Sequence, residues 1–77
     1  MNPYNLANAL RKTYRLPITN VTYNWENSNS DVTYYNVFTE SGRYFTISQI
    51  HKGMAEQKLD TTNLEDHIRC YYPELLI

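Results

Sequence analysis

The sequence contains few of the residues that cross-link a chain or bend it sharply. Its 77 residues include one cysteine, two glycines and three prolines. Because one cysteine cannot form a disulfide within the chain, the fold is expected to rest on its core and to suit a reducing cytoplasm. Two glycines are too few for a glycine-rich phosphate-binding loop, and so little glycine and proline excludes a low-complexity chain.

Long apolar runs and a strong net charge are also missing. No stretch approaches the roughly eighteen apolar residues of a membrane span. The first four residues lack a basic region followed by an apolar run, so no signal peptide is expected. A net charge of −1 argues against tight non-specific DNA binding. The length predicts one domain, residues 1–77, with no room for a Rossmann unit or a TIM barrel.

Tyrosine is abundant, and the charges are unevenly spread. Eight tyrosines cannot all lie in the core of so small a domain, so several are expected on half-buried strands or on a contact surface. Residues 1–17 carry three bases and no acid, whereas residues 56–77 carry five acids and two bases. Such opposed patches suit a protein partner, although solvated helix faces are the more common explanation.

The first half of the chain predicts one helix and three strands. Asn2 is a good N-cap and Pro3 fits the first helical turn, which predicts a helix over about 3–15 that ends before Pro17. Its apolar stripe consists of Leu6, Leu10 and Tyr14. Alternating apolar residues predict strands over 18–25, 32–39 and 43–48. The polar loop 26–31 and a turn at Ser41-Gly42 separate them, and the turn allows either of two hairpin registers.

The second half predicts two helices. Ser48 could cap a helix that carries Ile50, Met54 and Leu59. Thr62 followed by Glu65 is typical of a capping box, and a second helix is expected to end near Tyr72, before Pro73. The apolar stripe of that helix includes Leu64, Ile68 and Leu75. The predicted fold is an α+β domain of order α-β-β-β-α-α, with a three-stranded antiparallel sheet and helices packed mainly on one face.

Two adjacent aromatic pairs lie within the predicted strands, Tyr34-Tyr35 and Tyr44-Phe45. Neighbouring strand residues point to opposite faces, so each pair places one ring on each face. If both helices cover the same face, the other face exposes aromatic rings among threonines and serines. One helix on each face, or a homodimer, would cover them instead.

Sequence signals for catalysis and for metal binding are weak. His67 and Cys70 have a spacing that would reach one metal, but a zinc site wants four ligands, and His51 is the only other histidine. We therefore expect no metal, with His67 on the surface and Cys70 in the core. No nucleophile motif of the G-x-S-x-G type occurs, so we predict neither an enzyme nor a cofactor.

The order α-β-β-β-α over residues 3–59 resembles a double-stranded-RNA-binding domain. Residues 51–57, His-Lys-Gly-Met-Ala-Glu-Gln, stand where that family begins its last helix. The family carries a lysine cluster there, and this chain has Lys52 alone. The resemblance implies an alternative function, an RNA- or single-strand-binding module whose sheet tyrosines stack on bases. The cations that would contact phosphates are Arg11, Lys12, Arg15 and Lys52.

The layout also resembles small phage-encoded inhibitors, such as anti-CRISPR proteins that block a type II CRISPR nuclease. The matching parts are a short helix, a polar Asn/Ser loop, a hairpin and closing helices, at residues 3–15, 26–31, 32–48 and 49–76. Members with this layout are strongly acidic and this chain is not, so the resemblance implies inhibition by occupying a protein surface.

The combined hypothesis is a non-catalytic protein that binds a macromolecule, a host protein in the first instance. Tyrosine and arginine dominate the energetics of many interfaces, and the end of a hairpin is accessible. The predicted partner-binding residues are Tyr34, Tyr35, Tyr44, Arg43 and Glu40.

Overall fold

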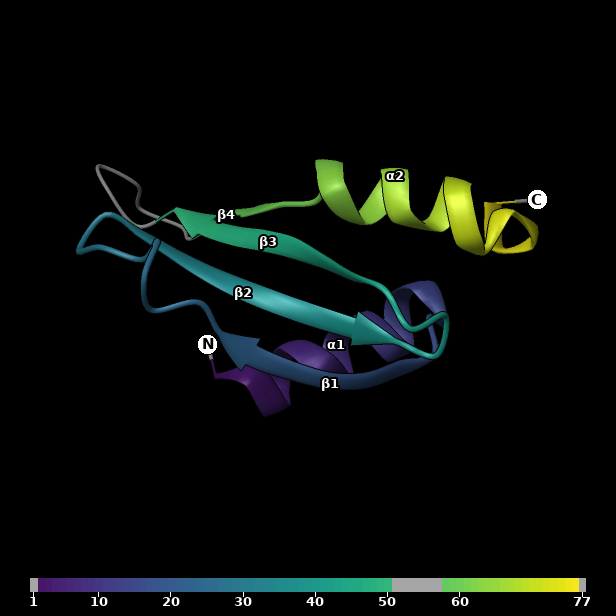
Figure 1. The fold of residues 1–77 in the computed structure, drawn as a ribbon, viewed down its shortest axis with the longest axis horizontal. Coiled ribbons are helices and arrows are strands. Elements are labelled where there is room, and N and C mark those ends of the chain that lie inside the picture. The colour runs from purple at the N-terminus through teal and green to yellow at the C-terminus, as the bar shows by residue number, and fades with distance from the viewer. Residues whose placement is uncertain (1, 51–57, 77) are drawn as a thin grey trace.

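In the computed structural model, four strands form one antiparallel sheet in the order β1-β2-β3-β4, accompanied by two α-helices (Figure 1). The structure describes residues 2–50 and 58–76. The elements are α1 (Pro3–Tyr14), β1 (Ile18–Tyr23), β2 (Val32–Thr39), β3 (Tyr44–Ile50), β4 (Lys58–Asp60), α2 (Thr62–Tyr71) and the short 3-10 helix η1 (Pro73–Leu76). The α+β class and the antiparallel sheet are confirmed.

The predicted count of three strands and the order α-β-β-β-α-α are wrong. The apolar residues assigned to a helix capped by Ser48 lie in strands, Ile50 at the end of β3 and Leu59 in β4. Gln49 of β3 pairs with Leu59, so the chain returns along β3 as a fourth strand. The helical spacing of Ile50 and Leu59 in the sequence is therefore coincidental. The rest of that predicted helix, with Met54, lies outside the described residues.

Residues at its two ends determine where helix α1 begins and ends. The Asn2 side-chain oxygen accepts a hydrogen bond from the Asn5 backbone N–H at 2.8 Å, as an N-cap should. The helix ends where Arg15 adopts a left-handed conformation, with φ of 58°, and donates its backbone N–H to the Arg11 carbonyl at 3.0 Å. Pro17 then leads directly into β1. The predicted helix over 3–15 is confirmed to within one residue.

Helix α2 begins differently from its prediction. Thr62 is the first helical residue rather than the cap, and its backbone N–H donates to the Asp60 carboxylate at 3.0 Å. The expected Thr62–Glu65 capping box is therefore wrong, because the acid that precedes the helix satisfies this N–H. The helix ends at Tyr71, and Pro73 starts the 3-10 turn, as the proline predicts.

The β2–β3 hairpin has a three-residue loop, Glu40 to Gly42. The Thr39 N–H donates to the Arg43 carbonyl at 3.2 Å, and the Gly42 N–H donates to the Thr39 carbonyl at 3.1 Å. Gly42 has a φ of 80°, which glycine adopts without strain. This loop sets the register that the sequence left open, with Val37 opposite Phe45.

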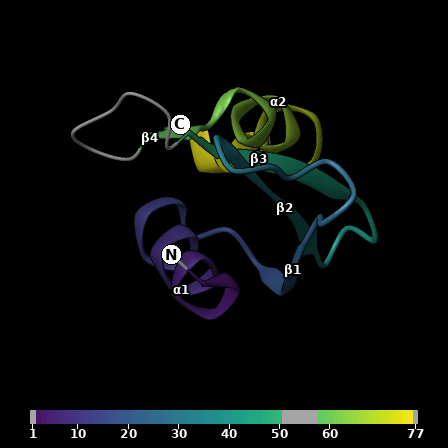
Figure 2. The same cartoon turned by 90° about the vertical axis from the view of Figure 1, so that its left-hand side faces the viewer.

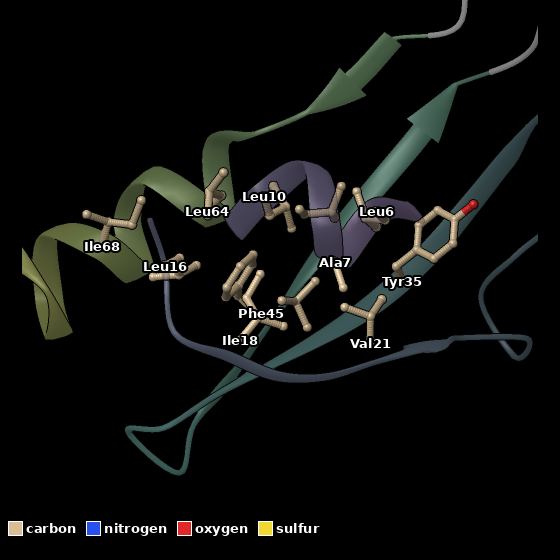
Figure 3. Close-up of a cluster of buried hydrophobic side chains, with 12 residues drawn as sticks. Leu6, Ala7, Leu10, Leu16, Ile18, Val21, Tyr35, Phe45, Leu64 and Ile68 are labelled. Carbon is tan, nitrogen blue, oxygen red and sulfur yellow. The ribbon is translucent and has the colours of Figure 1, made fainter. Parts of the chain in front are cut away.

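Both helices pack against the same face of the sheet. Leu6 and Leu10 of α1 and Leu64 and Ile68 of α2 are each at most 3 % exposed and belong to one cluster with the inward side chains of the strands (Figure 3). Figure 2 shows the sheet strongly twisted, with α1 near β1 and α2 near β3. The opposite face of the sheet carries no helix among the residues that the structure describes.

Candidate functional site

The uncovered side of the sheet, here called the open face, is the most distinctive surface of the molecule. It consists of alternate residues of three strands, Asn20, Thr22, Val32, Tyr34, Asn36, Phe38, Tyr44, Thr46, Ser48 and Ile50. Their strand neighbours, such as Tyr35 and Phe45, point into the core. The open face is thus the predicted second side of each aromatic pair.

Apolar side chains gather at both ends of the open face. At the hairpin end, Phe38 and Tyr44 are cross-strand partners with ring centroids 5.4 Å apart, and Tyr44 is 61 % exposed. At the other end, Val32 is the partner of Ile50, which is 38 % exposed. Cross-strand pairs of this kind stabilise a sheet. They also leave the apolar surface of Tyr44 and Ile50 exposed.

The centre of the open face is polar but uncharged. Asn36 lies between Thr22 on β1 and Thr46 on β3, and its side-chain oxygen accepts a hydrogen bond from the Asn24 amide at 3.4 Å. Strands β1, β2 and β3 place no charged residue on this face. Asp60 on β4, opposite Ser48, stands at its edge. Hydrogen bonds from Thr62 hold the pKa of this carboxyl below its ordinary value.

The predicted partner-binding residues separate into three groups. Tyr34 and Tyr44 lie on the open face, one ring from each aromatic pair, as the alternation requires. Glu40 and Arg43 are exposed at the hairpin loop next to Tyr44. Tyr35 does not belong with them: it is 1 % exposed, and its hydroxyl lies 3.3 Å from the Gln49 side-chain oxygen in the core. Burial raises the pKa of this phenol.

The residues proposed for nucleic-acid binding do not form one surface. Arg11, Lys12 and Arg15 are exposed, but they lie in and just after α1, which packs on the core side of the sheet. Tyr34 and Tyr44 face the other way. Lys52 lies outside the described residues. A strand of nucleic acid stacked on the tyrosines would therefore not pass over the basic helix.

The His67 and Cys70 half-site is also not formed. His67 is buried at 6 % exposure and Cys70 is exposed, the reverse of the predicted placement. Within residues 2–50 and 58–76, no group of three or more histidine, cysteine or acidic side chains could hold a metal ion. The apolar stripe of the helix carried a signal for this placement, because His67 stands three residues after Leu64 and next to Ile68, on the buried side, whereas Cys70 does not share that side.

Instead, His67 joins α2 to the hairpin. Its Nε2 lies 2.9 Å from the Thr39 hydroxyl, which lies 2.8 Å from the Ser41 hydroxyl. A histidine beside a hydroxyl is also found in nucleophilic sites. Here, however, Thr39 is only 3 % exposed and the imidazole is packed against the rings of Phe45 and Tyr71. Burial lowers the pKa of His67, which favours the neutral ring.

Sequence reasoning missed three apolar members of the open face, Val32, Phe38 and Ile50, and one groove. Phe38 and Ile50 follow from the same alternation as Tyr34 and Tyr44, so the correct register would have found them. A groove of about 420 Å³ runs between α1 and β1. No signal in the sequence indicates this groove, because it depends on how the helix sits against the sheet.

Comparisons with known proteins return no relative. No protein-family model, curated protein or solved structure matches the chain. The resemblances to RNA-binding domains and to phage-encoded inhibitors therefore stay predictions, and the four-stranded order departs from both layouts. In the part of the chain that the structure describes, no helix has the length and apolar character needed to cross a membrane.

Proposed function

We propose that this chain is a non-catalytic protein-binding module and that the open face is its binding surface. The proposal rests on one observation. Among the described residues no helix covers this sheet face, which presents Phe38 and Tyr44 and, on β1 to β3, no charged residue. The cores of protein interfaces are likewise depleted in charge and enriched in aromatic residues.

The chemistry of the open face defines the partner surface that would fit it. Opposite the apolar ends, the partner would present apolar or aromatic side chains. Between them it would present polar groups that form hydrogen bonds with the central amides and hydroxyls of the open face. Arg43 and Glu40 at the hairpin loop provide one charge of each sign at the rim. Rim charges influence association rates more than affinity.

Affinity capture with matched variants tests the proposal. The tagged protein is incubated with bacterial lysate, with and without nuclease treatment, alongside Tyr44→Thr and a control, Leu76→Thr. Tyr44 lies on the open face, whereas Leu76 is 53 % exposed on η1. Threonine suits a strand, so Tyr44→Thr should remain folded, and thermal unfolding checks this.

We expect capture of a protein that binds Leu76→Thr as tightly as the wild type and binds Tyr44→Thr at least about tenfold more weakly, as for an interface hot spot. We also expect binding to change little between about 0.15 and 0.5 M salt, since strands β1 to β3 place no charged residue on the face. Capture that disappears with nuclease and weakens steeply with salt would favour the nucleic-acid alternative instead. A captured nuclease whose activity falls on binding would support the inhibitor hypothesis.

A further inference from the structure

A second, independent surface lies at the β1 edge of the sheet. Within residues 2–50 and 58–76, β1 pairs with a strand on one side only, β2, so its other side presents backbone groups outward, beside α1 (Figure 1). Such an edge is a template for another strand. Whether another strand can pair with this edge depends on which of its outward N–H and carbonyl groups already have hydrogen-bond partners.

The hydrogen-bond pattern identifies those groups. In an antiparallel pair, hydrogen-bonded and non-bonded positions alternate. The Asn24 N–H donates to the Tyr34 carbonyl at 2.9 Å, so Thr22 also bonds to β2, while Val21 and Tyr23 direct their backbone groups away from it.

Part of this edge is satisfied from within the chain. The Val21 N–H donates to the Asn20 side-chain oxygen at 2.9 Å, and the Ile18 carbonyl accepts from the Arg11 guanidinium at 2.9 Å. No such partner occurs among the described residues for the Val21 carbonyl or for the N–H and carbonyl of Tyr23. These three groups alternate in the way that an added strand requires.

The groove beside this edge has room for the side chains of such a strand. It measures about 420 Å³ and is lined by Pro3, Tyr4, Ala7 and Arg11 of α1 and by Thr19, Asn20 and Val21 of β1. Tyr4, Ala7 and Arg11 are spaced to form one stripe of the helix. The small Ala7 leaves the middle of the groove open, between an aromatic ring and a cation.

The charge of the groove specifies the ligand further. Arg11 is its only charged lining residue, and the first acidic residue of the sequence is Glu26. The Arg11 guanidinium donates one N–H to Ile18 and one to the Asn8 side chain, at 2.9 and 3.5 Å. A guanidinium has five N–H groups, so donors remain for a carboxylate.

We propose that the groove between α1 and β1 binds an extended peptide segment of a partner protein as an added strand, with an acidic side chain of that segment on Arg11. Main-chain hydrogen bonds to Val21 and Tyr23 supply affinity, and the groove and Arg11 supply selectivity. The site differs from the open face, since it lies at the edge of the sheet and beside the helix.

Peptide selection followed by backbone modification tests this proposal. A displayed library of random segments about seven residues long, close to one strand length, is selected on the immobilised protein. Enriched peptides are synthesised with amidated C-termini, which removes the terminal carboxylate as a ligand. Their dissociation constants are measured by fluorescence anisotropy, for the parent peptide and for versions methylated at each backbone nitrogen in turn.

The expected peptides contain Asp or Glu beside β-branched residues. Methylation at alternate nitrogens should weaken binding by about tenfold or more, while methylation at the intervening positions should change it by less than about twofold, because only every second residue bonds to the edge. Arg11→Gln should weaken binding, whereas Lys12→Gln, on the same helix but outside the groove, should not.

Three outcomes would overturn the proposal: no enrichment above the display background, peptides that tolerate methylation at every nitrogen, or peptides insensitive to Arg11→Gln. Tyr44→Thr separates this site from the open face. Peptides that lose affinity in Tyr44→Thr bind the open face, which contradicts the edge site and leaves the proposed function standing.

Discussion

At the scale of single residues, His67 shows how one buried polar group ties distant parts of the chain together. Its ring lies against Phe45 of β3, Tyr71 of α2 and Tyr72, which follows the helix, and its Nε2 lies within hydrogen-bond distance of the Thr39 hydroxyl. No carboxylate is among these neighbours. A protonated ring would therefore be buried without a compensating charge.

This environment predicts that the protein loses stability in mild acid. Burial lowers the pKa of His67 in the folded state, while the unfolded state keeps a value near 6.5. Below that value the unfolded state binds more protons, so the free energy of unfolding falls as the pH falls, until the folded-state pKa is passed. Thermal unfolding between about pH 8 and 5 measures the decline in melting temperature.

The matched variant is His67→Gln, which keeps a hydrogen-bonding side chain but cannot be protonated. His51 and all carboxyl groups are common to both proteins, so the difference between them reports His67 alone. The stability advantage of the wild type should shrink as the pH falls. A difference that stays constant across the range would contradict the prediction.

The aromatic residues of the sheet also show which placements follow from the sequence and which do not. Alternation predicts that each adjacent aromatic pair places one ring on each face of the sheet, and both pairs, Tyr34-Tyr35 and Tyr44-Phe45, are split in this way. The sequence predicts both Tyr34 and Tyr35 as partner-binding residues, but Tyr35 lies in the core. Which tyrosine faces the helices is a tertiary fact, because both strand faces carry aromatic rings.

At the scale of elements, capping residues and strand composition are the reliable signals. β2 occupies the predicted residues, Val32–Thr39, because β-branched and aromatic residues fill it. β4 was missed because its three residues contain one apolar side chain, Leu59, too few to show alternation. Short edge strands of this kind are specified by their partner strand rather than by their own sequence.

The end of α1 supplies a prediction about stability. Arg15 holds a left-handed conformation that costs a non-glycine residue about 1 kcal/mol or more. Arg15→Gly removes this cost and should stabilise the protein by roughly 0.5–1 kcal/mol, net of the greater freedom of glycine in the unfolded chain. Urea-induced unfolding measures the change.

The control is Lys12→Gly, three residues earlier and also exposed, but inside the helix. There glycine should destabilise by about 1 kcal/mol. If Arg15→Gly raises the free energy of unfolding and Lys12→Gly lowers it, backbone conformation is identified as the cause. Equal losses would show that the Arg15 side chain matters more than its φ angle.

At the scale of the whole molecule, one hydrophobic cluster joins both helices to the sheet. Leu6 from α1, Ile47 from β3 and Leu64 from α2 are all fully buried in it. The sequence predicts a single domain of this kind, residues 1–77. Because the core is shared, we expect both helices and the sheet to unfold together.

Two leucines of α2 and η1 test this expectation. Leu64→Ala should lower the free energy of unfolding by about 2–5 kcal/mol, since it opens a cavity in the shared core. Leu76→Ala, where the side chain is 53 % exposed, should change it by less than about 0.5 kcal/mol. Unfolding is followed by Trp25 fluorescence and by far-ultraviolet circular dichroism.

Coincident transitions by the two probes would support a single cooperative unit. If Leu64→Ala separated them, α2 would have to unfold apart from the rest of the chain. That result would divide the domain at β4 and contradict the prediction of one core.

The strand order has a consequence for how quickly the chain reaches its fold. In the order β1-β2-β3-β4, each strand pairs with its neighbour in sequence, so every pairing closes a short stretch of chain. Contacts at small sequence separation cost little loop entropy, and proteins rich in them fold faster than those with distant pairings. Much longer stretches of chain separate the ends of α1 and of α2, where Tyr14, Ile68 and Leu75 line one groove. We therefore expect the sheet to form early and α2 to dock late, so that substitutions in α2 mainly speed unfolding.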